Sequence, residues 1–243
     1  MSWQSFLLNG VLRLALKSQG DKPINLDRVR AGTLKPPRRA LRIPEGISVT
    51  EVHTENGLRF DLIDQSAPRD KPPGTVVLYL HGGGYFFGSP RTHRQAIIGV
   101  ARACAAPAYG LFYRLAPEHP FPAAFEDATK AYRWVLEKHP GARILLAGDS
   151  AGGGLSIVTA LAARDAGLPA PAGLICYSPW TDLAVTGGSV LTNAKSCAMF
   201  TPTGVRRGAG AAGLESATFV HAGGDSVVVD QISDCVDKVT ESR

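Results

Sequence analysis

The stretch from residue 145 to 154 constrains this chain most, because it predicts a strand, a tight turn and a helix in immediate succession. An apolar run at 144–147 leads into Gly148-Asp149-Ser150-Ala151-Gly152, and a helical pattern begins at Gly154. The glycines on either side of Ser150 let other backbone segments approach closely, while the turn strains the serine itself. Gly-x-Ser-x-Gly between a strand and a helix is typical of a nucleophile elbow. The sequence therefore predicts Ser150 as a nucleophile, at a helix N-terminus whose dipole favours negative charge.

A second glycine motif follows another apolar run. Residues 75–80 are continuously apolar, as in a strand buried on both faces of a parallel sheet, and His81-Gly82-Gly83-Gly84 follows at once. Glycines leave backbone N–H groups unshielded, so these groups can bind an oxyanion. Residues 85–87 are Tyr-Phe-Phe rather than the Gly-Lys-Ser/Thr of a phosphate loop, which favours an apolar acyl or alcohol pocket. We expect His81, like His93, to be a core histidine rather than a proton carrier, with His81 orienting the loop.

Strand-like and helix-like segments alternate along the chain. Strands are expected at 47–53, 58–63, 75–80, 108–112, 144–147 and 174–177, and helices at 94–105, 122–137 and 154–166. Asn56-Gly57 between the first two strands is a hairpin signal. The alternation predicts an α/β domain with a mostly parallel sheet, whose ligands bind beyond the carboxyl ends of the strands.

The amino-acid composition limits the class of protein to which this chain can belong. The chain has 243 residues, of which 44% are hydrophobic and 19% charged, as in a soluble domain with one core. No apolar run reaches the ~18 residues of a membrane span, and the start lacks the basic segment of a secretory signal. Apolar residues between Trp3 and Ala15 recur at helical spacing. We expect that stripe to pack on the domain, with a substrate-pocket cover or peripheral lipid contact as the alternative.

The net charge and the cysteines indicate which kinds of partner this chain is expected to bind. The net charge is +5, and much of the excess lies in a basic stretch made of Arg28, Arg30, Lys35, Arg38, Arg39 and Arg42. Prolines interrupt this stretch and no aromatics interleave, so we expect a solvated linker and no nucleic-acid partner. The four cysteines show no Cys-x-x-Cys pairing. They are expected to be free thiols in a reducing compartment, which favours a cytoplasmic location and no metal site.

Two further segments complete a resemblance to a known family. Residues 113–123 read Tyr-Arg-Leu-Ala-Pro-Glu-His-Pro-Phe-Pro-Ala, and residues 178–183 read Ser-Pro-Trp-Thr-Asp-Leu. With the two glycine motifs, and in the same order, they resemble the hormone-sensitive-lipase-like carboxylesterases of the α/β-hydrolase fold. The resemblance extends from the N-terminal helix through Asn193. It implies an N-terminal cap helix and basic linker at 1–43, an α/β-hydrolase core at 44–243, an ester substrate and no cofactor.

The resemblance also implies residue roles. Ser150 would be the nucleophile, and the backbone N–H groups of Gly82, Gly83 and Ala151 would form the oxyanion hole. His81, Gly84 and Asp149 would support the site, with Asp149 bracing the oxyanion loop. The N-terminal helix would be part of the cap over the acyl pocket.

The C-terminal part departs from the family pattern. Triad order in this fold is serine, acid, histidine, and residues 218–230 resemble the acid-bearing segment. Asp225 is the candidate acid, while another register puts Ser226 at that position and Asp230 is a further alternative. No histidine follows Asp225, and His221 precedes it within an expected strand.

The segment before the expected acid also departs from the pattern. Gly208, Gly210 and Gly213 are poor residues for a helix interior, although Thr201-Pro202 resembles the start of a family helix. The chain thus resembles a shortened family member, with part of the cap and the final strand and helix missing.

Two functions follow as expectations. The first is a carboxylic ester hydrolase whose activity is impaired, because a serine without its base is a weak nucleophile at neutral pH. The alternative is a non-catalytic small-molecule binder. The plant gibberellin receptors resemble this family and lack the catalytic histidine.

Overall fold

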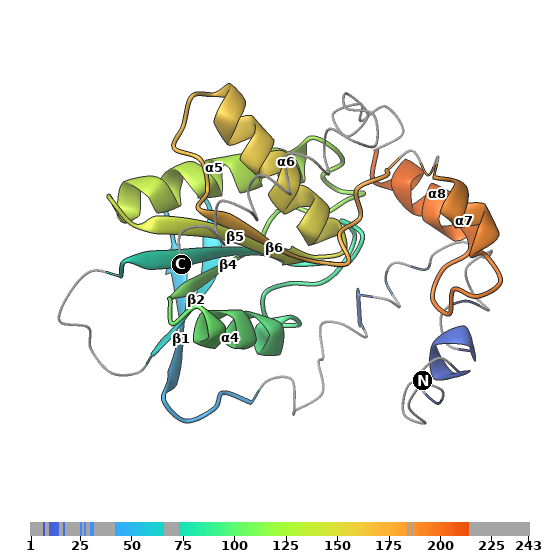
Figure 1. The fold of residues 1–243 in the computed structure, drawn as a ribbon, viewed down its shortest axis with the longest axis horizontal. Coiled ribbons are helices and arrows are strands. Elements are labelled where there is room, and N and C mark those ends of the chain that lie inside the picture. The colour runs from blue at the N-terminus through green and yellow to red at the C-terminus, as the bar shows by residue number, and fades with distance from the viewer. Residues whose placement is uncertain are drawn as a thin grey trace, which may run out of the picture.

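The computed structural model describes residues 7, 10–14, 17, 25, 27, 30–31, 42–65, 73–183, 185 and 187–213. These residues contain a six-stranded sheet with helices on both faces, in the strand order β1-β2-β4-β3-β5-β6 (Figure 1). The strands are β1 (Ile47–His53), β2 (Arg59–Gln65), β3 (Thr75–Leu80), β4 (Ala108–Leu111), β5 (Arg143–Asp149) and β6 (Gly173–Tyr177). The helices are α4 (Arg94–Ala103), α5 (Ala123–Lys138), α6 (Ala151–Asp165), α7 (Gly188–Thr192) and α8 (Pro202–Ala211).

The sheet combines an antiparallel hairpin with a parallel core. β1 pairs with β2 across the turn at Asn56-Gly57, with Gly57 at φ 82°, as the hairpin signal predicts. β2 pairs antiparallel with β4, whereas the β4–β3, β3–β5 and β5–β6 pairs are parallel. The expectation of an α/β fold with a mostly parallel sheet is therefore confirmed.

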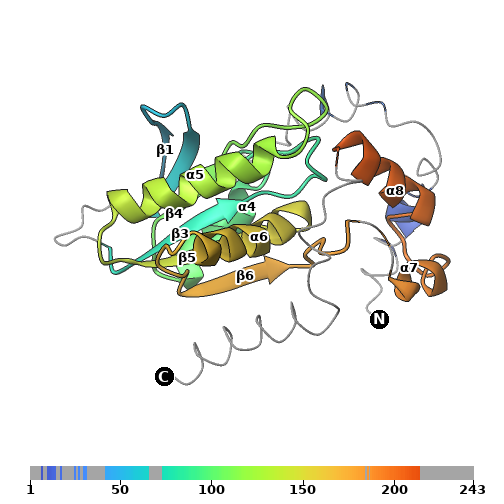
Figure 2. The ribbon, with the colours of Figure 1, turned by 90° about the horizontal axis from the view of Figure 1, so that it is seen from above.

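Helices cover the two faces of the sheet in separate layers. The residues of β3 alternate between them: Val76, Leu78 and Leu80 pack in the core with α5 and α6, while Val77 and Tyr79 pack with α4. Because both faces are buried, this strand is apolar throughout. Helices α7 and α8 lie at the end of the sheet toward which β6 points (Figure 2). The carboxyl ends of the parallel strands thus face this part of the molecule, where ligands bind in such sheets.

Helix α6 begins directly after Ser150, earlier than the expected start at Gly154. Glycines weaken helices, but here tertiary packing requires them. A Cβ on Gly152 would strike the carbonyl oxygens of Leu80 and His81. A Cβ on Gly154 would strike the carbonyl oxygen of Trp180. The close approach of α6 to β3 and to the β6–α7 connection therefore outweighs the glycine penalty.

Helix α8 begins at Thr201-Pro202, where the sequence indicates a helix start, although it contains glycines that are poor residues for a helix interior. Gly208 and Gly210 both lie inside it. The helix has a proline in its first turn, and the Thr201 side chain accepts the backbone N–H of Gly204 at 3.0 Å. Gly208 is buried and faces the Phe86 ring, so the missing side chain permits this packing. The expected acid segment, residues 218–230, lies outside the described residues.

The N-terminal helical residues do not pack as expected. Leu7, Val11 and Leu14 are 56%, 60% and 79% exposed, so these apolar side chains face away from the domain. Cationic side chains attach this segment to the turn at 194–197 instead. Lys17 donates to the carbonyls of Ala194, Lys195 and Cys197 at 2.7, 3.1 and 2.8 Å, and Arg13 donates to that of Ser196 at 3.2 Å.

None of the helices among the described residues combines the length and the apolar character that crossing a bilayer requires. Three of the four cysteines are described, and Cys104, Cys176 and Cys197 are free thiols.

Candidate active site

Ser150 stands in a strained turn between β5 and α6. Its backbone has φ 51° and ψ −121°, a conformation that costs a residue with a side chain about 1–3 kcal/mol. Both sides of the turn are held by hydrogen bonds. The Ser150 N–H donates to the Tyr177 carbonyl at 2.9 Å, and the Ser150 carbonyl accepts the Trp180 N–H at 2.8 Å. The surrounding strands therefore impose the strain that an elbow requires.

The glycine loop is attached to the elbow on both sides of Ser150. The Gly82 N–H donates to Oδ1 of Asp149 at 3.1 Å, and the Tyr85 hydroxyl donates to the Ala151 carbonyl at 3.0 Å. The loop thus runs from the residue before Ser150 to the residue after it. The two residues between these attachments, Gly83 and Gly84, must therefore pass alongside the serine.

Gly82 differs from its expected role. Its N–H is directed to the Asp149 carboxylate, so it is not available to an oxyanion in this arrangement. Within the described part of the chain, the N–H groups of Gly83, Gly84 and Ala151 donate no hydrogen bond. Gly84, expected only to support the loop, has φ 61° and is the better candidate donor. Gly82 and Asp149 together brace the loop.

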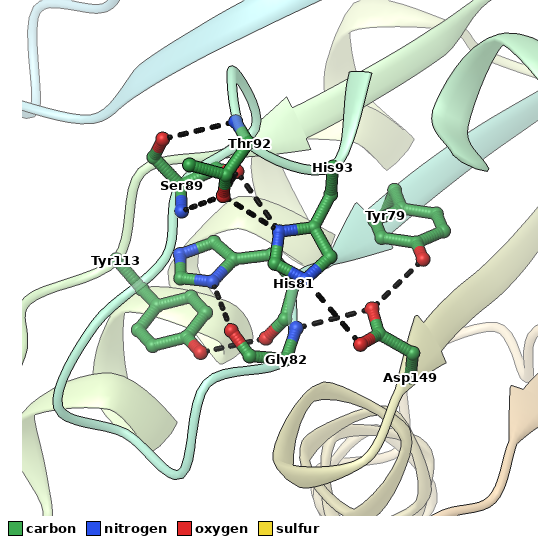
Figure 3. A network of polar contacts seen from close by, with 8 residues as sticks. All are labelled: Tyr79, His81, Gly82, Ser89, Thr92, His93, Tyr113 and Asp149. Atoms are coloured by element: carbon green, nitrogen blue, oxygen red, sulfur yellow. Dashed lines mark hydrogen bonds and ion pairs between the residues drawn. The ribbon is translucent and has the colours of Figure 1, made fainter. Parts of the chain in front are cut away.

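Asp149 is the centre of a partly buried polar network (Figure 3). Besides Gly82, its Oδ1 accepts the Tyr79 hydroxyl at 2.9 Å, and its Oδ2 lies 3.4 Å from Nε2 of His93. Burial alone would raise the pKa of Asp149, but the hydrogen bond and charge of His93 and the donors Tyr79 and Gly82 lower it overall. Burial lowers the pKa of His93, yet its contact with Asp149 raises it overall. The pair therefore favours a carboxylate facing an imidazolium.

His81 is a buried, neutral histidine beneath the glycine loop. It is 1% exposed, and its ring stacks on Tyr113 with centroids 4.2 Å apart. Its Nδ1 lies 2.7 Å from the Gly82 carbonyl oxygen, which makes Nδ1 the protonated nitrogen (Figure 3). Burial lowers the pKa of His81 to about 3. These contacts suit a residue that orients the loop and does not carry protons near neutral pH.

None of the described histidines hydrogen-bonds to Ser150 within the part of the chain that is placed. His53 contacts Glu51 on β1, and His139 contacts Tyr109. The candidate acid Asp225, its alternatives Ser226 and Asp230, and His221 lie outside the described residues. The structure thus brings together the glycine loop and Ser150, the expected nucleophile, while the acid stays a prediction.

Three tyrosines support the site, and none of them was assigned this supporting role from the sequence. Tyr79 binds Asp149, Tyr85 binds the elbow at Ala151, and Tyr113 donates to the His81 carbonyl at 2.7 Å. Tyr85 was expected with Phe86 to line an apolar pocket, and both are largely buried. Tyr85 still borders a narrow pocket with Leu155. Only the position of Tyr85 after the glycines was a usable signal.

Among the described residues, no group of three or more His, Cys, Asp or Glu side chains is placed so that it could hold a metal ion. The ionised group nearest to Ser150 in sequence is Asp149, which is occupied by His93, Tyr79 and Gly82. The groups gathered here are the serine of the strained turn and the backbone N–H groups of the loop attached on both sides of it.

Comparison with known proteins agrees with this geometry. A family model described as alpha/beta hydrolase fold matches residues 77–222. An acetyl-hydrolase of Streptomyces hygroscopicus is 52% identical over 120 residues, which are 49% of this chain and 40% of that protein. The sequence match therefore spans less than half the length of this curated relative.

Solved esterase structures resemble the chain over a larger share. The structure of EstE5 soaked with p-nitrophenyl butyrate has a TM-score of 0.77 and 33% identity, covering 100% of this chain and 85% of that one. An esterase from the bacterial hormone-sensitive lipase family has a TM-score of 0.75 and 32% identity with the same coverage. With the elbow and the glycine loop in their places, the chain belongs to the α/β-hydrolase fold family, among the serine esterases and lipases related to hormone-sensitive lipase.

Proposed function

We propose that this chain hydrolyses small carboxylic esters with Ser150 as nucleophile. One observation carries the proposal: Ser150 is held in a strained turn, and the loop attached on both sides of it presents backbone N–H groups. The relatives named as an acetyl-hydrolase and as esterases support a small acyl group.

The reaction uses these groups in a fixed order. The Ser150 oxygen attacks the ester carbonyl carbon, and the carbonyl oxygen becomes an anion. The N–H groups of Gly83, Gly84 and Ala151 stabilise that anion, and each such donor is worth about 10²–10³ in rate. The anion then collapses, and the alkoxide leaves as the alcohol after taking from solvent a proton equivalent to the one that Ser150 gave up. Water hydrolyses the acyl-serine to the carboxylic acid and restores the Ser150 hydroxyl. The N-terminus of α6 favours the developing negative charge.

The proton of the Ser150 hydroxyl needs an acceptor, and this sets the expected rate. None of the described histidines meets Ser150, and no histidine follows Asp225 in the sequence. Loss of the base costs about 10⁶ in turnover, while the oxyanion hole and binding retain ~10³ over water. We therefore propose slow, Ser150-dependent turnover for the 243-residue chain.

The role of Ser150 as nucleophile is tested with a fluorophosphonate probe and with two ester substrates, p-nitrophenyl acetate and p-nitrophenyl butyrate. We expect an adduct on Ser150 and ester turnover that Ser150→Ala abolishes. Ser156→Ala is the matched control, because Ser156 lies on the same helix with its hydroxyl bonded to the Gly152 carbonyl at 2.9 Å. Unchanged turnover in Ser150→Ala, or no adduct on the folded chain, would remove the proposed nucleophile.

A non-catalytic binder is the second candidate function, favoured by the lack of contact between Ser150 and the described histidines. In that case a short-chain ester or its acid would raise the melting temperature of the wild type and of Ser150→Ala equally. Turnover that depends on Ser150 would rule this alternative out.

A further inference from the structure

Arg30 belongs to the basic stretch that precedes the sheet and to none of the sequence motifs, yet its side chain contacts the glycine loop. Its Nε–H donates to the Phe86 carbonyl at 2.8 Å, across 56 residues of chain. Its terminal nitrogens donate to the Glu118 carboxylate at 2.5 and 2.8 Å and to the Ala116 carbonyl at 2.6 Å. The hydrogen bond with Glu118 raises the pKa of Arg30, so the guanidinium remains charged. A three-quarters-buried cation is thus directed at the backbone of the loop.

Two consecutive hydrogen bonds connect this cation to the candidate oxyanion donors. The peptide unit between Phe86 and Phe87 accepts from Arg30 through its carbonyl, and its N–H donates to the Gly83 carbonyl at 3.2 Å. The Phe86 N–H donates to the same Gly83 carbonyl at 3.0 Å. The Gly83 carbonyl belongs to the peptide unit whose N–H is that of Gly84. A relay of two peptide units therefore leads from the guanidinium to the Gly84 N–H.

The planarity of the peptide bond makes this relay directional. In a trans peptide unit the carbonyl and the N–H point in opposite directions. Holding the Gly83 carbonyl toward the amides of Phe86 and Phe87 therefore turns the Gly84 N–H to the other side of the loop. Gly83 and Gly84, at φ 119° and 61°, have no Cβ to restrict rotation of this unit. Its orientation thus depends on the hydrogen bonds at its carbonyl.

The charge of Arg30 adds an electrostatic effect to this orientation. Hydrogen bonds in a chain polarise one another, and a charged donor at one end strengthens the donors that follow. An N–H polarised in this way is a better partner for an oxyanion. The same cation also joins Ala116 and Glu118 to Phe86, which keeps the end of the loop in place.

We propose that Arg30 is a positioning residue for the oxyanion hole, which orients and polarises the Gly84 N–H through the carbonyls of Phe86 and Gly83. The inference rests on the proposed ester hydrolysis and extends it, because it assigns a catalytic contribution to the segment that precedes the sheet. Arg30 does not touch the substrate in this scheme.

Steady-state kinetics on the full chain test the contribution to rate. We expect Arg30→Gln to lower kcat about tenfold, less than the about 10²–10³ that loss of an oxyanion donor costs, with KM changed less than twofold. Arg30→Lys should recover part of kcat, since lysine keeps the charge but not the forked contacts with Phe86, Ala116 and Glu118. Arg13→Gln is the matched control, because Arg13 contacts Ser196 and not the loop. Its kcat should equal that of the wild type.

An NMR measurement on glycine-labelled protein tests the relay independently of turnover. We expect the Gly84 amide proton to move upfield in Arg30→Gln and to stay in place in Arg13→Gln, with both variants cooperatively folded. An unmoved Gly84 amide in Arg30→Gln overturns the inference, as does a kcat within twofold of an active wild type. If the wild type neither turns over esters nor labels at Ser150, the proposed function fails, and the Gly84 amide alone decides the relay.

Discussion

Nε2 of His93 lies 3.4 Å from Oδ2 of Asp149, which connects the start of α4 to the last residue of β5, directly before Ser150. Both groups are largely removed from solvent, and each stabilises the charged form of the other against the effect of burial. The pair therefore links the charge balance of the site to the position of the elbow.

Replacing the carboxylate should reveal this coupling. In Asp149→Asn we expect the pKa of His93 to fall below its ordinary value, because burial then acts without the opposing charge. An NMR titration of the histidine rings measures it, with His53 on the exposed end of β1 as an internal reference. A His93 pKa that stays raised in this variant would contradict the assigned pairing.

The buried His81 should make the fold sensitive to mild acid. The unfolded chain protonates this histidine near pH 6.5, whereas the folded chain does so only near pH 3. Between these values the unfolded state binds more protons, so stability falls as the pH falls, by about 1.4 kcal/mol per pH unit at most. Urea unfolding at pH 7 and pH 5 measures the loss. An NMR signal showing His81 protonated at pH 5 in the folded protein would contradict this explanation.

The strain at Ser150 should be measurable as stability. Its φ of 51° and ψ of −121° suit glycine, so Ser150→Gly should raise the free energy of unfolding by about 1 kcal/mol over Ser150→Ala. Ser150→Ala removes the same hydroxyl but keeps the strained Cβ, which makes it the matched control. The greater chain entropy of unfolded glycine opposes the gain but is smaller. Equal stability of the two variants in urea would show that the turn is relaxed.

Two glycine-to-alanine changes should have opposite effects. Gly152→Ala places a Cβ against the carbonyl oxygens of Leu80 and His81, and we expect a loss of about 2–4 kcal/mol. Gly99→Ala, on the exposed side of α4 with nothing within 4 Å, should gain about 1 kcal/mol through helix propensity. Thermal unfolding of both variants measures the contrast. A Gly152→Ala protein as stable as the wild type would mean that α6 does not approach β3 as closely as described.

Sequence reasoning located the local features of the site well. The elbow at Ser150, the loop after β3 and the hairpin at Asn56-Gly57 depend on residues close together in the chain. It identified Thr201-Pro202 as the start of α8 but gave no reason for the glycines inside that helix, because the packing of Gly208 on Phe86 is a tertiary contact. In the N-terminal stripe it missed the exposure of Leu7, Val11 and Leu14, since periodicity shows which residues share a face but not whether anything covers that face.

The turn at Ser150 between a strand and a helix and the glycine loop at the end of β3 can be read from the sequence, because both follow from residue types at fixed short spacing. Which backbone groups of the loop remain available depends instead on tertiary contacts. Asp149 occupies the Gly82 N–H, and Arg30 reaches Phe86 from a segment that carries no motif. These contacts join residues distant in the chain, and no local pattern specifies them, because they depend on how the sheet and its connections bring the segments together.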